Sequence, residues 1–273
     1  MNARDDSYVF IHIGKTAGSA VRGAVQSAFR PEQVCPLVFQ DDIAALTTED
    51  RQRFRLYCAH VGFDTASQLG RNLFTVLRDP VDRTLSQYYY WREVTGEGLG
   101  VRNAKALSLD AFLDSDDAAM LVDLENLQTW QLACAQDLHT RERVSQLKSL
   151  DQVYQAALDN VAAMDVVGVQ ENLPLFMDDL TERYGWYLPP PPPVNVTNSR
   201  LPREDISLTT RKKIHRLVEA DIELYAYVLA SRVNVPRKRG RLLKRHLSAP
   251  AIKRGIARAA GALRRRSGNP GGF

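Results

Sequence analysis

Apolar residues in the first third of the chain change from strand-like to helical spacing twice, and each change predicts a strand, a loop and a helix. Residues 8–13 form a short apolar run rich in β-branched and aromatic side chains, and residues 19–29 carry apolar side chains at helical spacing. The same order of strand, loop and helix is predicted a second time, because residues 73–77 resemble a buried strand and Pro80 begins a helix. When each strand is followed by a helix, neighbouring strands run parallel to each other. The pattern therefore predicts an α/β fold with a parallel β-sheet flanked by helices.

The rest of the chain continues this alternation. A buried strand is predicted over residues 166–169, and helices are predicted over residues 107–113, 126–135, 147–164, 173–184 and 209–228. The five prolines at 189–193 cannot lie inside a helix or a central strand, so they predict an extended segment that presents residues 195–200 as a loop.

Composition divides the chain into a globular part and a tail. With 273 residues and 44% hydrophobic content, the chain can bury one substantial core, and we predict one domain over residues 1–235. Residues 236–273 hold twelve Lys or Arg and no acid, whereas residues 1–235 hold 32 acids against 24 bases. The acidic body argues against a nucleic-acid partner. The basic tail is compatible with a disordered, solvated extension, or with a segment that contacts an anionic membrane or an acidic polymer, with residues 251–263 as a basic amphipathic helix.

Two further observations bear on the compartment. No apolar stretch approaches the roughly 20 residues that span a bilayer, and residues 1–8 are too polar for a secretory signal, so we expect a cytoplasmic protein. The cysteines, Cys35, Cys58 and Cys134, are odd in number and widely spaced. They predict reduced structural thiols and no metal site.

The loop after the first strand has the composition of an anion cradle. Lys15 supplies a charge, Thr16 and Ser19 supply hydroxyl donors, and Gly18 permits close approach of the backbone. Because the loop opens a helix, its N–H groups and the positive end of the helix dipole converge there. The first glycine of an ATP-binding P-loop is absent, since Val9 stands in its place. Taken alone, the loop is equally compatible with an ordinary turn.

The second strand ends in a charged cluster. Arg78 lies at the carboxyl edge of the predicted sheet, where open α/β sheets bind ligands, and its guanidinium could fork onto a phosphate that Ser86 also reaches. We expect Asp79 to cap the helix that Pro80 begins and Arg83 to pair with Asp79 on the surface.

Together these residues resemble the PAPS-dependent sulfotransferases, specifically the carbohydrate group that includes heparan sulfate 2-O-sulfotransferase; PAPS is 3'-phosphoadenosine-5'-phosphosulfate. Residues 10–20 are similar to the family's Lys-Thr loop for the 5'-phosphosulfate, and residues 74–91 to its Leu-Arg-Asp-Pro segment for the 3'-phosphate. Residues 57–63 resemble its Gly-His loop, and residues 195–200 occupy the place of a basic loop over the 3'-phosphate. Cys58 stands where the 2-O enzymes have a second histidine, so a heparan-like acceptor is not implied.

The resemblance implies a P-loop-like fold, PAPS as co-substrate without a metal, and transfer of a sulfuryl group to a hydroxyl of an acceptor, expected to be a glycan. It implies His60 as general base and Lys15 as the group that stabilises the leaving phosphate. The implied donor-binding residues are Lys15, Thr16, Ala17, Gly18, Ser19, Ala20, Arg78, Ser86, Asn198 and Arg200. His12 is a rival base, but its position in a buried strand favours a core residue.

The acceptor side is less well defined. Asn126, Gln128 and Trp130 could line an acceptor groove with amide groups and a stacking face, although Trp130 is equally compatible with the core. Two other functions stay open, namely a nucleotide-dependent kinase with a divergent P-loop and a non-catalytic module that binds PAPS or a polyanion.

Overall fold

A computed structural model describes residues 7–135, 137–191 and 201–233. The predicted loop at residues 195–200, with Asn198 and Arg200, lies outside the described residues. The basic tail at residues 236–273 also lies outside them.

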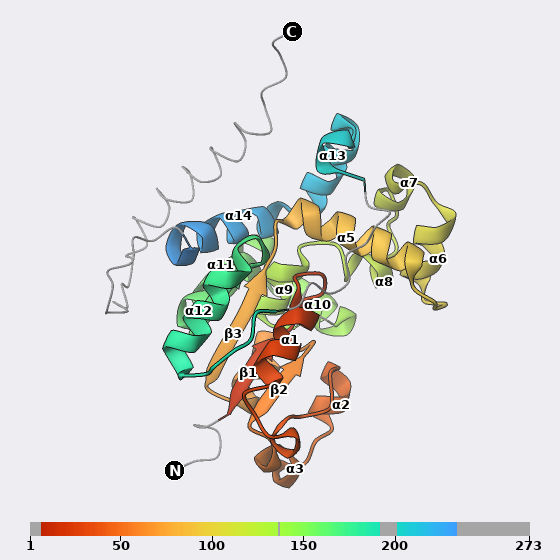
Figure 1. Cartoon of the computed structure of the whole chain (residues 1–273). Helices are drawn as coiled ribbons and strands as arrows, with labels where there is room; N and C mark the ends of the chain where they lie inside the picture. The colour runs from red at the N-terminus through yellow and green to blue at the C-terminus, as the bar shows by residue number, and fades with distance from the viewer. Residues whose placement is uncertain (1–6, 136, 192–200, 234–273) are drawn as a thin grey trace.

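The described residues form a parallel β-sheet in the strand order β2-β1-β3-β4 (Figure 1). Its strands are β1 (Tyr8–Ile11), β2 (Leu56–Ala59), β3 (Asn72–Leu77) and β4 (Val166–Val169). Every neighbouring pair is parallel, which confirms the predicted α/β fold. The sequence analysis did not predict β2, because basic residues interrupt the apolar run around it.

Helices connect the strands and extend the domain beyond the sheet. They are α1 (Gly18–Gln26), α2 (Gln40–Ala44), α3 (Thr48–Arg53), α4 (Phe63–Leu69), α5 (Pro80–Glu93), α6 (Leu99–Ala106), α7 (Leu109–Leu113), α8 (Ala118–Leu121), α9 (Leu127–Ala133), α10 (Leu138–Ser145), α11 (Leu150–Ala163), α12 (Leu173–Tyr184), α13 (Leu208–Leu217) and α14 (Glu219–Val228).

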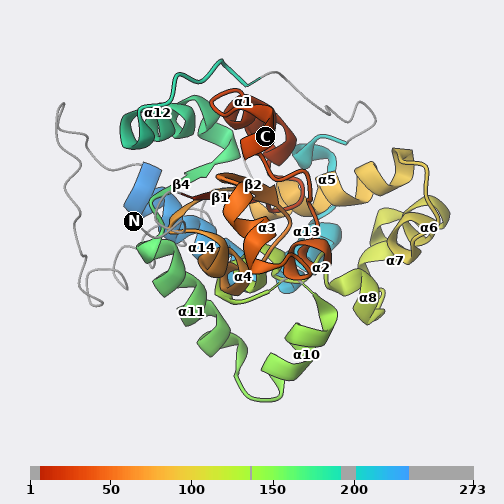
Figure 2. The ribbon, with the colours of Figure 1, turned by 90° about the horizontal axis from the view of Figure 1, so that it is seen from below.

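The period-two pattern of the strands divides the core between the two faces of the sheet. Phe10 and Phe74 pack with α1 and α12 on one face. Val9, Ile11 and Leu73 pack on the other face with α4, α9, α11 and α14. Figure 2 shows α1 and α12 on one side of the sheet and α4, α11 and α14 on the opposite side. Both faces are covered, as expected for a parallel sheet.

A third apolar cluster lies beyond the sheet and joins α5 to α6, α7, α8 and α13. Leu85 and Phe112 are fully buried in it. This cluster fixes α5, which begins directly after β3, so the residues at the start of α5 are held firmly at the edge of the sheet.

The prediction of one helix over residues 209–228 was wrong, because the segment divides at Val218 into α13 and α14. Val218 leaves helical geometry with φ −126° and ψ 30°. The side-chain oxygen of Asn126 accepts hydrogen bonds from the N–H groups of Ala220 (2.9 Å) and Asp221 (3.2 Å), while the Asn126 N–H donates to the carbonyl of Leu217. A contact from about 90 residues away therefore satisfies both new helix ends.

All four strands end at the same edge of the sheet. His12, His60, Arg78 and Gln170 come at or just after the ends of β1, β2, β3 and β4, respectively. In an open α/β sheet this carboxyl edge is the usual place for a ligand. No helix among the described residues is long and apolar enough to span a membrane.

Candidate functional site

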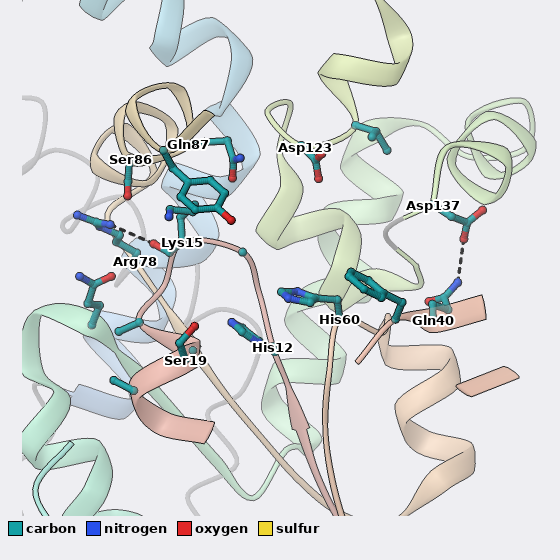
Figure 3. Close-up of a pocket in the computed structure, with 18 of the residues that line it drawn as sticks. His12, Lys15, Ser19, Gln40, His60, Arg78, Ser86, Gln87, Asp123 and Asp137 are labelled. Atoms are coloured by element: carbon teal, nitrogen blue, oxygen red, sulfur yellow. Dashed lines mark hydrogen bonds between the residues drawn. The ribbon is translucent and has the colours of Figure 1, made fainter. Parts of the chain in front are cut away.

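A pocket of about 620 Å³ lies at the carboxyl edge of the sheet (Figure 3). His12, His60, Arg78 and Gln170, which follow the four strands, all line it. Its wall is completed by the loop before α1, by α5, and by the segments around residues 39–41, 122–123 and 137.

The first loop wraps the pocket as predicted, with one exception. Lys15 and Ala17 adopt left-handed backbone conformations, with φ of 68° and 66°, and these turns open the N-terminus of α1 toward the pocket. Gly14, Lys15, Ala17, Gly18, Ser19 and Ala20 line the pocket. Thr16 does not, because its side chain is fully buried and its hydroxyl donates to the carbonyl of Ile13 at 2.9 Å. Its hydroxyl therefore stabilises the turn instead of donating into the pocket.

Gly18 is required by its contact with His12. A Cβ atom on Gly18 would lie 1.9 Å from Cδ2 and 2.0 Å from Nε2 of the His12 ring. The glycine thus lets the start of α1 pack directly against a side chain that lines the pocket.

Lys15 projects into the pocket, where its ammonium lies 3.6 Å from the centroid of the Tyr90 ring. Burial, and after it the nearby charge of Arg78, lowers the pKa of Lys15 to about 8. Lys15 therefore remains mostly protonated at neutral pH, and a bound anion would stabilise its charged form further.

Arg78 lies beside this loop. Its Nη1 donates to the carbonyl of Lys15 at 3.1 Å, so the guanidinium and the ammonium line one pocket although they follow different strands. Ser86 in α5, the helix that begins two residues after Arg78, lines the same end of the pocket (Figure 3). The structure thus brings together the two cations that the sequence analysis assigned to opposite ends of one donor.

Asp79 and Arg83 do not pair with each other as predicted. Asp79 caps α5 by accepting from the N–H groups of Val81 and Asp82, which confirms that part of the prediction, but its second oxygen pairs with Arg203 at 2.8 Å. Arg83 is fully buried and donates to the backbone carbonyls of Asp123 and Leu124, in the segment that follows α8.

The residues predicted for an acceptor groove lie beneath the pocket. Asn126 and Gln128 are buried, and none of Asn126, Gln128 and Trp130 lines the pocket. The Gln128 amide accepts from the N–H of Arg78 (2.9 Å) and donates to its carbonyl (3.0 Å), while Asn126 holds the break between α13 and α14. Trp130 packs in the core against the guanidinium of Arg141. These side chains support the site by fixing its backbone.

The start of α9 is held by one buried carboxylate. Asp221 is fully buried, and its two oxygens accept from the N–H groups of Gln128 (3.2 Å) and Thr129 (2.7 Å). Burial raises the pKa of Asp221, although Arg83 and these two N–H groups oppose the shift. Asp221 therefore anchors the segment that holds Arg78 in place.

His60 lies opposite the two cations in the pocket, between two other rings. Its ring stacks on that of His12, with centroids 4.1 Å apart and planes at 26°, and the exposed ring of Phe39 lies on it at 6.1 Å. The His60 N–H donates to the carbonyl of Val38 at 2.7 Å. Burial lowers the pKa of His60, while the His12 backbone and Asp123 act in the opposite direction. A neutral imidazole at this position can accept a proton.

The expectation that His12 is a core residue holds only for its backbone. The His12 N–H donates to the carbonyl of Ala59 within the sheet, but its ring lines the pocket against His60. Burial, followed by the charge of His60, lowers the pKa of His12 to about 3. His12 is therefore neutral over the physiological range and packs behind His60.

The sequence analysis missed the wall beyond His60. Phe39, Gln40, Asp41, Asp123 and Asp137 line this part of the pocket. The Gln40 amide donates to Asp137 Oδ2 at 3.0 Å, which joins α2 to the start of α10. These residues follow no motif and are separated by about 100 positions, so no local pattern indicated that they share a site.

Within the described residues, no group of three His, Cys, Asp or Glu side chains could hold a metal ion. A family model described as the sulfotransferase family matches residues 1–228. No curated protein and no solved structure matches the chain significantly.

Proposed function

This chain belongs to the sulfotransferase family, and from that premise we propose that it transfers a sulfuryl group from PAPS to a hydroxyl of a carbohydrate acceptor. The observation that carries the proposal is that Lys15 and Arg78, which follow β1 and β3, line one pocket together with His60, which follows β2. Two cations and a neutral base in one pocket suit transfer from a nucleotide that carries two separate anionic groups, a 3'-phosphate and a 5'-phosphosulfate.

Lys15 and Arg78 are suited to bind different groups of the donor. The loop of residues 15–20 offers an ammonium, the Ser19 hydroxyl and the N-terminus of α1, a set of groups that suits the 5'-phosphosulfate. Arg78 and Ser86 form the adjoining wall, which suits the 3'-phosphate. The 5'-end of the donor would thus lie closer to His60, on the His12 side of the pocket.

The proposed chemistry is an in-line displacement at sulfur. The acceptor oxygen attacks the sulfur, the bond from sulfur to the bridging phosphate oxygen breaks, and the hydroxyl proton passes to His60. Negative charge grows on the leaving phosphate only as that bond breaks. Since Lys15 would stabilise this growing charge, its contribution is larger in the transition state than in the ground state.

His60 is better suited than His12 to act as base. Both rings line the pocket, but His12 is 9% exposed and lies behind His60, and its pKa of about 3 makes it a much weaker proton acceptor. We therefore assign His12 the role of holding the His60 ring in position.

Thermal shift with the desulfated donor, PAP, tests the proposal against the kinase alternative. We expect PAP without metal to raise the Tm, because ligand at 100 times its Kd adds about 2.7 kcal/mol to the unfolding free energy. ATP should act weakly whether or not magnesium is present. Stabilisation by magnesium ATP alone would refute the donor assignment.

Matched variants test whether the two cations act together. We expect Lys15→Ala and Arg78→Ala each to abolish most of the PAP shift, because each removes a charged contact worth about 1.5–3 kcal/mol. Lys105→Ala and Arg102→Ala on α6 remove the same charges from exposed positions away from the pocket, and they should keep the full shift. If the two pairs of variants behave alike, Lys15 and Arg78 do not form the donor site.

A further inference from the structure

Charge is divided between the two ends of the pocket. The cations that line it, Lys15 and Arg78, lie together at one end. Beyond His60 the lining carries three carboxylates, those of Asp41, Asp123 and Asp137. In Figure 3, Lys15 and Arg78 lie on one side of His60, Asp137 lies on the other side, and Asp123 lies above His60. The donor end is basic, and the end left for the acceptor is acidic.

Part of the acidic end is held in place by hydrogen bonds between separate segments of the chain. Asp137 Oδ2 accepts from the side-chain Nε2 of Gln40 at 3.0 Å, and the side-chain Oε1 of Gln40 accepts from the N–H of Gly62 at 3.0 Å. Gly62 itself packs so closely on the backbone of Cys134 that a Cβ would lie 2.1 Å from the Cys134 oxygen. The loop after His60, α2 and the start of α10 are therefore tied together around this end.

Asp137 retains its negative charge in this wall. Burial opposes its ionisation, but hydrogen bonds from Thr140 and Gln40 outweigh burial and lower its pKa. Asp41 is exposed in the first turn of α2. At neutral pH the wall therefore presents anionic groups to whatever occupies it.

Asp123 extends this negative charge toward the base. Burial lowers the pKa of His60, and the charge of Asp123 opposes part of that shift, so the two groups interact electrostatically. Buried Arg83 and Arg141 lie behind Asp123 and offset part of its charge, but neither of them lines the pocket. The pocket surface next to His60 is thus negative, with its compensating cations beneath it.

An exposed aromatic ring completes the acceptor end. Phe39 is 61% exposed and lies nearly parallel to the His60 ring, with planes at 21°. A large exposed ring beside a catalytic base is a stacking surface for a sugar ring or for a cation. Together with the carboxylates, it selects a ligand that has an apolar face and a positive charge.

We infer that the acceptor is a hydroxyl compound that carries a protonated amine, such as an amino sugar whose amine is not acetylated. The inference rests on the proposed function and specifies its acceptor class. A polyanionic acceptor of the heparan type would bring like charges against Asp41, Asp123 and Asp137.

The same charge pattern determines which atom receives the sulfuryl group. An amine held by carboxylates stays protonated and has no lone pair with which to attack sulfur. The hydroxyl oxygen therefore forms the new bond, its proton passes to His60, and the phosphate leaves with the electron pair of the broken bond. The expected product is an O-sulfate whose amine remains free.

Calorimetric titration of the PAP-saturated protein at pH 6.5 tests this preference without requiring turnover. The probes are a glucosamine oligosaccharide with free amines, its fully N-acetylated counterpart of the same length, and a heparin oligosaccharide. We expect the free-amine oligosaccharide to bind at least about tenfold more tightly than the other two, because each well-placed charge pair adds to its affinity. Equal binding of the free and acetylated oligosaccharides would overturn the inference, as would a preference for heparin.

A matched pair of variants on one helix turn identifies the charges responsible. Asp41 lines the pocket, whereas neighbouring Asp42 is also exposed but does not line it. Asp41→Asn combined with Asp123→Asn should remove most of the amine preference, and Asp42→Asn should retain it. An unchanged preference in the double variant would overturn the inference.

PAP binding distinguishes a failure of the proposed function from a failure of the inference about the acceptor. If PAP fails to bind, the proposed function fails. If PAP binds and labelled sulfate is transferred to acetylated or anionic glycans as readily as to the free-amine oligosaccharide, the proposed function holds and the inference about the acceptor is wrong.

Discussion

Replacing Gly18 with alanine tests whether the contact between the start of α1 and the His12 ring is as tight as the structure shows. The new Cβ would overlap the His12 ring, lying 1.9 Å from Cδ2. That ring cannot easily retreat, because it stacks on His60 at 4.1 Å and on Phe10 at 5.6 Å and is only 9% exposed. Forcing a methyl group into such a packed site costs about 1–3 kcal/mol.

Urea unfolding measures this cost, and a second glycine of the same helix provides the control. Nothing lies within 4 Å of a Cβ built on Gly23, which is exposed. Gly23→Ala should therefore gain up to about 1 kcal/mol, because alanine is the better helix former. Gly18→Ala should lose stability and turnover together, since moving His12 also displaces His60.

A double variant shows whether the His12 ring causes the loss. His12→Ala removes the atoms that the new methyl group would meet, so His12→Ala with Gly18→Ala should be more stable than the sum of the single changes predicts, by about 1 kcal/mol or more. If Gly18→Ala is as stable as the unmodified protein, or if the two changes are additive, the contact does not constrain the loop as argued.

Three further expectations follow from the site. Burial and Arg78 lower the pKa of Lys15 to about 8, so its ammonium loses a proton as pH rises through that value. PAP affinity measured by titration should therefore fall by up to about tenfold per pH unit above pH 8. Constant affinity to pH 10 would contradict the role of Lys15. His60→Ala should lower the rate of labelled-sulfate transfer by about a hundredfold or more yet leave PAP affinity nearly unchanged, and full turnover in this variant would exclude His60 from the chemistry. Asp221 accepts two buried N–H bonds and interacts with the charge of Arg83, so Asp221→Asn should lower the free energy of urea unfolding by about 3 kcal/mol. Asp178→Asn, on the exposed side of α12, should change it by almost nothing. Equal stabilities of the two variants would refute the anchoring role of Asp221.

Local patterns in the sequence predicted the elements that carry Lys15 and Arg78, the two cations of the proposed donor site. The strand, loop and helix around Lys15 and the strand and helix around Arg78 were predicted near their observed bounds. Strand alternation, helical spacing and Pro80 are properties of neighbouring residues, and the donor loop is itself one continuous segment. The family could be inferred from these same residues for that reason.

Other features depended on contacts between distant parts of the chain. Asn126 divides residues 209–228 into two helices, and Arg83 is buried against the segment that follows α8 instead of pairing with Asp79. In each case a polar group finds its partner only after the chain has packed.

The sequence by itself determined the α/β class, the basic donor loop and the second cation, because each is encoded within a few consecutive positions. Only the tertiary structure decided that the wall beyond His60 is acidic, since its carboxylates come from Asp41, Asp123 and Asp137 on segments that are far apart in the chain. The physical reason is that a pocket at the edge of a parallel sheet is closed by loops from every strand and by the helices between them. Its charge is therefore a sum over distant residues, which no local pattern contains.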